Sequence, residues 1–279
     1  MEKFKPQELK KLYKPAHESA GEDNGQITII GGSSLFHGAP ILSLKVASRL
    51  VDMVFFASPE KSVGRVAEQI KAHLSSFVWV PWEEVDEYLK KSDAILIGPG
   101  FMRFRSEGTQ EEEKLSCDEA CRETKKMTEG LLQKFPDKKW VIDAGSLQVM
   151  DPTLIPEGAI LTPNKKEYEI LFGNLSPKEA AKKYKCTIVL KGPTTQVASA
   201  EKTVDVTNGN AGLTKGGTGD VQAGLTVALL SKNEAFLSAS CASYLVKKAA
   251  DELYQKVGTG YNADDLADFI PTSFHNLRK

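Results

Sequence analysis

Short apolar runs rich in β-branched residues recur along the chain, and helical patterns separate most of them. Seven such runs fall at residues 26–32, 53–58, 77–80, 94–98, 139–143, 159–162 and 186–192. Helical periodicity marks several of the intervals, as in "APILSLKVASRLV", "EKSVGRVAEQIKAHL", "WEEVDEYLKK" and "SPKEAAKKYK". Strands that alternate with helices are typical of βα units, and continuously apolar strands fit a parallel sheet that is covered on both faces. The sequence therefore predicts an α/β fold with a mostly parallel central sheet.

The pattern changes after Lys191. The stretches "TQVASA" and "KTVDVT" predict two extended segments with a turn near Glu201, and two helices are expected at 219–231 and 233–257. A longer helix is predicted over 107–134, because acids lie early in it and lysines late, the order that a helix dipole favours. No linker or repeat divides the chain, so we expect a single domain over residues 1–279, in which the first ~25 residues form an extension.

Composition narrows the partners and the compartment. Lys and Arg total 36 against 37 Asp and Glu, so no global field favours nucleic acid or an anionic membrane, and neither is an expected partner. The N-terminus lacks a secretory apolar region and no stretch is long enough to span a membrane, so a cytoplasmic protein is predicted. Four cysteines are few for this length, which fits a reducing compartment. Cys117 and Cys121 are interpreted as ordinary helix thiols, since no histidine or further cysteine lies near them.

Polar or glycine-rich stretches follow five of the predicted strands. They are "GGSSLFHGAP", "GPGF", "DAGSL", "TPNKKE" and "KGPTT". In a sheet of this kind ligands bind beyond the carboxyl ends of the strands, where loops lead into helices. We therefore expect these loops to converge on one pocket.

The stretch "KGGTGD" has the features of an anion site. Gly216, Gly217 and Gly219 would allow positive φ and close approach of a ligand, while the helix that follows presents unpaired N–H groups. A carboxylate beside a bound phosphate is unfavourable unless it takes a proton from the attacking group, which makes Asp220 a candidate general base. The alternative is a glycine-rich turn in which Asp220 is an ordinary acid of a helix N-terminus.

The other loops carry weaker signals. "GGSSLFHGAP" is neither a P-loop nor a dinucleotide-binding turn. Lys191, with the hydroxyls that follow it, could meet nucleotide phosphates or could simply be solvated. Asn164 could donate a hydrogen bond to a ligand, and Glu167 could hold Mg²⁺ through water, or the segment could be a helix start capped by Thr162. Histidines are too scarce for a histidine-based nucleophilic triad.

In this order the stretches resemble the ADP/ATP-dependent NAD(P)H-hydrate dehydratases, a branch of the ribokinase-like superfamily. The likeness runs from about residue 24 to 260 and rests on "GGSSLFHGAP", "DAILIGPGF", "VIDAGSL", "LTPNKKEYEILFG", "VLKGPTT" and "NGNAGLTKGGTGDVQAG". The resemblance implies a ribokinase-like three-layer αβα fold. It also implies a repair reaction, in which ADP or ATP with Mg²⁺ phosphorylates the hydroxyl of NADH or NADPH hydrate and phosphate then leaves.

The resemblance also implies roles for individual residues. Asp220 would be the catalytic acid–base group, and no residue is assigned as a direct metal ligand. Contacts to the damaged dinucleotide are expected from Ala39, Gly100, Asn164, Glu167 and Asp220. Contacts to the nucleotide are expected from Lys191, Gly192, Pro193, Thr194, Thr195, Gly216, Gly217, Thr218 and Gly219.

Two positions depart from the family pattern. Asn164 stands where many bacterial members have histidine, and Gly145 stands where many have the second aspartate of Asp-Ala-Asp. The alternatives are a vitamin-precursor or sugar kinase of the same superfamily, which keeps the phosphate on its product, and a nucleotide-binding regulator without catalysis. We expect no epimerase domain in the chain, a separate epimerase as a possible partner, and a homo-oligomer.

Overall fold

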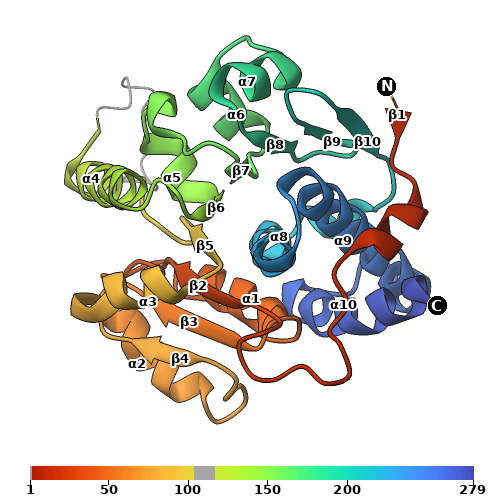
Figure 1. Ribbon diagram of the computed structural model, residues 1–279, viewed down its shortest axis with the longest axis horizontal. Helices are drawn as coiled ribbons and strands as arrows, with labels where there is room; N and C mark the ends of the chain where they lie inside the picture. Colours follow the sequence, from red (N-terminus) through yellow and green to blue (C-terminus); the bar gives the residue numbers. More distant parts are fainter. Residues whose placement is uncertain (1, 104–116) are drawn as a thin grey trace.

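One ten-stranded sheet organises the molecule, which a computed structural model describes for residues 2–103 and 117–279. Its order is β1-β10-β9-β8-β7-β6-β5-β2-β3-β4 (Figure 1). The strands are β1 (Glu2–Lys3), β2 (Gln26–Ile30), β3 (Met53–Ala57), β4 (Val78–Val80), β5 (Ala94–Ile97), β6 (Lys139–Ile142), β7 (Ile160–Leu161), β8 (Thr187–Leu190), β9 (Thr195–Ala198) and β10 (Thr203–Val206). All seven apolar runs thus contain strands, as predicted.

The strand directions also agree with the sequence. From β8 to β4 every neighbouring pair is parallel, whereas β9 runs antiparallel to both β8 and β10. The predicted hairpin is therefore β9 and β10, with Thr203 opposite Ala198. Because β8, β7, β6, β5 and β2 are parallel, their carboxyl ends share one edge of the sheet, and the loops that follow them start there.

Helices cover both faces of the sheet. They are α1 (Gly38–Ala47), α2 (Lys61–Ile70), α3 (Val85–Lys91), α4 (Glu119–Lys134), α5 (Ala144–Val149), α6 (Lys165–Phe172), α7 (Pro177–Tyr184), α8 (Thr218–Lys232), α9 (Ala235–Val257) and α10 (Ala263–Arg278). Strand residues alternate between the faces: Ile27 and Ile29 pack with α1, α2 and α8, whereas Ile30 packs with α3 to α7. This arrangement confirms the predicted α/β architecture.

Helix α8 occupies the middle of one face (Figure 1). It packs against α1 and α9 and lies over β2, β5 and β6. Twelve of its residues are buried, which fits a central helix that is apolar on all sides. Gly224 permits close contact with α1, since a Cβ there would collide with the backbone of Ser43. The first turn of α8 is thereby fixed at the carboxyl edge of the sheet.

The N-terminal segment is part of this packing. β1 pairs in parallel with β10, and the 3-10 helix Pro6–Lys11 contacts α9 and α10. Leu9 is fully buried and Leu12 nearly so. Helix α10, which the sequence patterns did not predict, carries Pro271 in its interior. Both chain ends lie on the right of Figure 1, and Arg278 of α10 donates to the carbonyl of Leu12.

The predictions for residues 107–134 need correction. Helix α4 begins only at Glu119, capped by the side chain of Asp118, and the part of the predicted helix before residue 117 lies outside the described residues. Cys117 precedes the helix and is bonded to Cys121, with 5.2 Å between their Cα atoms. The prediction of two helix thiols is therefore wrong, because Cys117 lies outside the helix and its sulfur is bonded to that of Cys121. A disulfide is also unusual for the reducing compartment that the cysteine count suggested.

Within the described residues, no helix combines the length and the apolar character that crossing a membrane requires.

Candidate functional site

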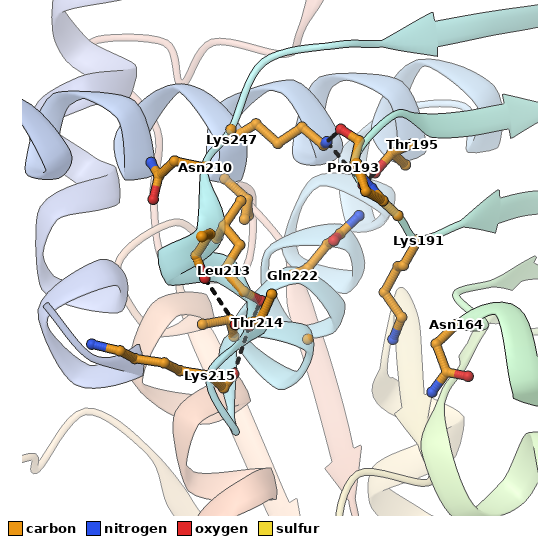
Figure 2. Close-up of a pocket in the computed structure, with 16 residues that line it drawn as sticks. Asn164, Lys191, Pro193, Thr195, Asn210, Leu213, Thr214, Lys215, Gln222 and Lys247 are labelled. Carbon is orange, nitrogen blue, oxygen red and sulfur yellow. Dashed lines mark hydrogen bonds between the residues drawn. The ribbon is translucent and has the colours of Figure 1, made fainter. Parts of the chain in front are cut away.

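A cavity of about 710 Å³ opens at the carboxyl edge of the sheet, a typical size for a small-molecule site. The turn after β8, the segment 209–215 and the start of α8 enclose it (Figure 2). The predicted site residues that line it are Asn164, Lys191, Gly192, Pro193, Thr195, Thr218 and Gly219. Loops after β7 and β8 thus converge with the glycine turn, as expected. The loops after β2, β5 and β6, which were predicted to join the same pocket, contribute no residue to its lining.

The glycine turn differs in detail from the prediction. Only Gly217 takes positive φ, at 91°, and it is the N-cap of α8. A Cβ there would also strike Leu42 and Ala263. Gly219 lies inside the first turn of α8 and has no positive φ, and Gly216 is exposed, with nothing near the position of a Cβ. Of the three glycines that could allow positive φ, only Gly217 therefore uses that freedom.

The first turn of α8 nevertheless keeps the features of an anion site. Gly217 supplies no side-chain acceptor to the N–H groups that begin the helix. The absence of a side chain at Gly219 leaves room for a close neighbour, because a Cβ there would lie 3.4 Å from the Lys191 ammonium nitrogen. Backbone N–H groups, a helix dipole and a lysine therefore meet at one point of the cavity.

Asp220 follows directly in the first turn of α8 and is partly exposed. The Ser43 hydroxyl of α1 donates to its backbone carbonyl at 2.7 Å, which holds this turn against α1. The pKa of the Asp220 carboxyl is raised to about 7: burial has the largest effect, Asp143 and Glu167 also raise it, and Lys191 lowers it. A carboxyl with a pKa near neutrality can both accept and return a proton.

Lys191 is held by a buried carboxylate rather than solvated. Its ammonium donates to Asp143 Oδ1 at 2.9 Å, and the Thr162 hydroxyl donates to the same oxygen at 2.7 Å. Asp143 is 1% exposed. The backbone N–H of Lys191 donates to the carbonyl of Pro163, which joins the loops after β7 and β8. In Figure 2 the side chains of Lys191 and Asn164 lie at one side of the cavity.

Asn164 and Glu167 cap helix α6 together. Asn164 Oδ1 accepts from the N–H of Glu167, and Glu167 Oε2 accepts from the N–H of Asn164. Asn164, not Thr162, is therefore the cap, because the Thr162 hydroxyl is bonded to Asp143 instead. Glu167 is buried and its other oxygen accepts from Gln148. The cap leaves the amide N–H₂ of Asn164 free of any acceptor among the described residues, at the wall of the cavity.

Ala39 and Gly100 lie together but outside the lining of this cavity. Ala39 is the second residue of α1, and Gly100 follows β5 with φ of 75°. A Cβ on Gly100 would lie 3.2 Å from the Cβ of Ala39 and 2.6 Å from the carbonyl of Phe36. Asp220, Glu167, Thr194, Gly216 and Gly217 also do not line the cavity itself. The structure thus separates the cavity from a second group of loops after β2 and β5.

Several residues that line the cavity were not singled out by the sequence. Lys247 of α9 is buried and donates to the carbonyls of Gly192 and Pro193, at 3.0 and 2.6 Å (Figure 2). Asn210, which also lines the cavity, accepts from the Tyr261 hydroxyl at 2.8 Å. The sequence offered one signal for Lys247, which is a lysine within an apolar stretch of a predicted helix. Lysines are rarely buried unless they are paired.

Gly145 has a packing role. A Cβ at this position would collide with the carbonyl and side chain of Phe101. An aspartate could therefore enter here only if Phe101 moved. Within residues 2–103 and 117–279 no three carboxylate, imidazole or thiol side chains are grouped to hold a metal ion.

Comparison with known proteins agrees with this geometry. The profile of a family described as NAD(P)H-hydrate dehydratase matches residues 27–272. The bifunctional NAD(P)H-hydrate repair enzyme of Methanocaldococcus jannaschii is 36% identical over 270 residues, which cover 95% of this chain and 51% of that protein. The chain therefore spans about half the length of this relative. The ADP-dependent (S)-NAD(P)H-hydrate dehydratase of Nitrosopumilus maritimus is 28% identical, and the match covers 95% of this chain and 94% of that protein.

A solved structure shares the fold. The ADP/ATP-dependent NAD(P)H-hydrate dehydratase of Bacillus subtilis, crystallised with ATP and Mg²⁺, superposes with a TM-score of 0.75 at 21% identity and covers 99% of this chain. A ribokinase-like superfamily protein of Enterococcus faecalis superposes with a TM-score of 0.79 at 21% identity. These likenesses confirm the predicted ribokinase-like fold, and the family match covers nearly the whole chain. The protein belongs to the NAD(P)H-hydrate dehydratase family.

Proposed function

We propose that this protein restores reduced nicotinamide cofactors from their hydrates in a reaction that consumes ADP or ATP. The substrate is NADH or NADPH that has taken up water across a ring double bond, in the S configuration. The observation that carries the proposal is the position of Asp220. Its carboxyl has a pKa of about 7 and lies next to Gly219, which lines the cavity. One hydrogen bond from Ser43 ties its turn to α1, the helix that begins near Ala39.

The two groups of loops take the two reactants. The nucleotide enters the cavity, where the turn after β8, with Lys191, Gly192, Pro193 and Thr195, and the first turn of α8 at Gly219 surround its phosphates. The hydrated dinucleotide lies against Ala39 and Gly100, and the free amide of Asn164 donates to it. Glu167 contributes by holding Asn164 through the cap. The reacting hydroxyl then faces Asp220 where the two reactants meet.

The chemistry requires one proton acceptor and one anion site. The Asp220 carboxylate takes the proton of the ring hydroxyl while that oxygen bonds to the terminal phosphorus, and the bond from phosphorus to the leaving oxygen of the nucleotide breaks. The ring nitrogen then supplies its lone pair, the carbon–oxygen bond to phosphate breaks, and loss of a proton from the neighbouring ring carbon restores the double bond. The products are NADH or NADPH, inorganic phosphate, and AMP from ADP or ADP from ATP.

Mg²⁺ fits this scheme as a companion of the nucleotide. When bound, it would neutralise charge on the phosphates that are transferred and released. The N–H groups of the first turn of α8 and the Lys191 ammonium contribute from the protein side. Support comes from relatives, since the archaeal dehydratase is described as ADP-dependent and the bacterial dehydratase was co-crystallised with ATP and Mg²⁺.

The test is the return of reduced-nicotinamide absorbance when the purified protein meets hydrated NADH, Mg²⁺ and either ADP or ATP. Recovery should require a nucleotide and should fall about 10²-fold or more in Asp220→Asn, the scale of a lost general base. Near-normal recovery in Asp220→Asn would remove Asp220 from the mechanism. Consumption of nucleotide without recovery would point to a small-molecule kinase, and binding without consumption would point to a regulator.

A further inference from the structure

No part in the reaction has been assigned to Asp143, yet the backbone around it has an unusual conformation. It is the N-cap residue of α5, a position at which aspartate usually accepts from the first helical N–H groups, but its carboxylate makes no such bond. The next residue, Ala144, has φ of 47°, a left-handed conformation that L-residues other than glycine rarely adopt. Gly98 leaves space for the Asp143 carbonyl, because a Cβ there would collide with it. Strain of this kind is typical of functional sites.

Instead of capping α5, the Asp143 carboxylate pairs with Lys191. Asp143 Oδ1 accepts from the Lys191 ammonium at 2.9 Å and from the Thr162 hydroxyl at 2.7 Å. The two charged side chains are 2% and 19% exposed, so the pair lies beneath the surface of the site. A buried pair contributes little to stability as a rule, because desolvation offsets the attraction. Its presence here therefore calls for a role other than stability.

The position of the ammonium indicates that role. The Lys191 nitrogen lies 3.4 Å from the point where a Cβ of Gly219 would stand, beside the first turn of α8. We propose that Asp143 is a positioning residue of the reaction, which holds the Lys191 ammonium beside Gly219 so that the pair acts together with Asp220 on the phosphoryl group and the hydroxyl. The inference rests on the proposed function, which supplies the identity of the reaction. The effect of the two charges on Asp220 does not depend on that function.

The same pair must act on the protonation of Asp220. The ionisable groups that influence the Asp220 carboxyl are Asp143 after β6, Lys191 after β8 and Glu167 of α6. From α1 the neighbour of this turn is Ser43, which does not titrate in this range. Asp143 disfavours the charged form of Asp220, and Lys191 favours it. Removing either charge should therefore move the titration of Asp220, and the two removals should act in opposite directions.

The direct readout is ¹³C NMR of protein labelled at its aspartate carboxyl carbons, titrated without substrate or nucleotide. The signal that disappears in Asp220→Asn identifies Asp220, and its midpoint is expected at about 7. Asp143→Asn should lower that midpoint by about one pH unit, since a negative neighbour is lost. Lys191→Met should raise it by a similar amount, since a positive neighbour is lost.

Two variants serve as controls. Thr162→Val removes the hydroxyl bond to Asp143 but no charge, so the midpoint of Asp220 should stay in place. A lone buried charge could prevent Lys191→Met from folding. The double variant Asp143→Asn/Lys191→Met leaves no unpaired charge, and its midpoint should lie between those of the two single variants.

Turnover measured in parallel tests the positioning itself. Asp143→Asn should lower kcat about 10-fold or more, because a misplaced catalytic group is costly, while KM for the nucleotide changes little. Midpoints that do not move, or that move in the same direction in both single variants, would overturn the inference. Active wild-type protein with unmoved midpoints would remove only the role of Asp143. Moved midpoints in a protein without dehydratase activity would remove the proposed function but leave the charge pattern standing.

Discussion

The raised pKa of Asp220 predicts that this residue destabilises the folded protein. Folding raises the pKa of its carboxyl from 3.8 to about 7, chiefly through burial. Between those two pH values the folded protein keeps a proton that the unfolded chain gives up. The folded state then binds more protons than the unfolded state, so the free energy of unfolding falls as pH rises from about 4 to about 7. Asparagine cannot titrate, and Asp220→Asn should therefore remove this loss.

The size of the effect follows from linkage. One pKa unit corresponds to about 1.4 kcal/mol, and integration from about pH 5 to about pH 8 gives a difference of about 3 kcal/mol. This is an upper value, because Asp220 keeps part of its surface in contact with solvent. The free energy of unfolding of Asp220→Asn, taken relative to wild type, should therefore be higher at about pH 8 than at about pH 5 by up to this amount. The gain in stability should accompany the loss of turnover.

Urea unfolding at both pH values measures the difference. The protein is kept free of nucleotide and Mg²⁺, because ligands that bind only the folded state would add their own contribution. Asp137→Asn, at an exposed turn before β6, controls for the loss of a carboxylate as such. An Asp220→Asn protein whose stability relative to wild type is the same at both pH values would refute the argument. Asp220 would then titrate as an ordinary surface carboxyl.

Three further substitutions test the site and its strain. Gly219→Val should weaken nucleotide binding about 10-fold or more, because a side chain there meets the Lys191 ammonium at 3.4 Å, and unchanged affinity by calorimetry would mean that this glycine serves only the fold. Lys247→Met should raise KM for the nucleotide with a smaller effect on kcat, because it frees the turn at 192–193, and an unchanged KM would assign the lysine to packing alone. Ala144→Gly should stabilise the protein by about 1 kcal/mol or less in urea unfolding, since glycine tolerates φ of 47°, and a loss of stability would show that the strain is not there.

Local sequence patterns predicted most of the fold. Apolar runs located every strand from β2 to β8, because a parallel strand buried on both faces needs a continuous apolar stretch. The hairpin β9–β10 and helices α8 and α9 followed from the same reasoning. Helix α10 was missed, since Pro271 in its interior resembles a helix end. The two-residue strand β1 is fixed by its partner β10, which no local pattern encodes.

The candidate site was harder to predict because its contacts are long-range. Glycines, an acid and a lysine could be recognised as chemistry, but Lys191 is 48 positions from Asp143 and their pairing depends on neighbouring loops of the folded sheet. The approach of Lys247 to residues 192–193 spans a similar interval. Backbone dihedral angles could not be predicted either: the sequence allowed positive φ at Gly216, Gly217 and Gly219, and the structure has it only at Gly217 among these three.

The most direct test of the account measures reduced nicotinamide and inorganic phosphate together during turnover of hydrated NADH. We expect one phosphate to be released for each NADH recovered, with either ADP or ATP as donor, and both products to be lost in Asp220→Asn. Nucleotide consumption that leaves a stable phosphorylated product, with neither NADH nor free phosphate, would contradict it.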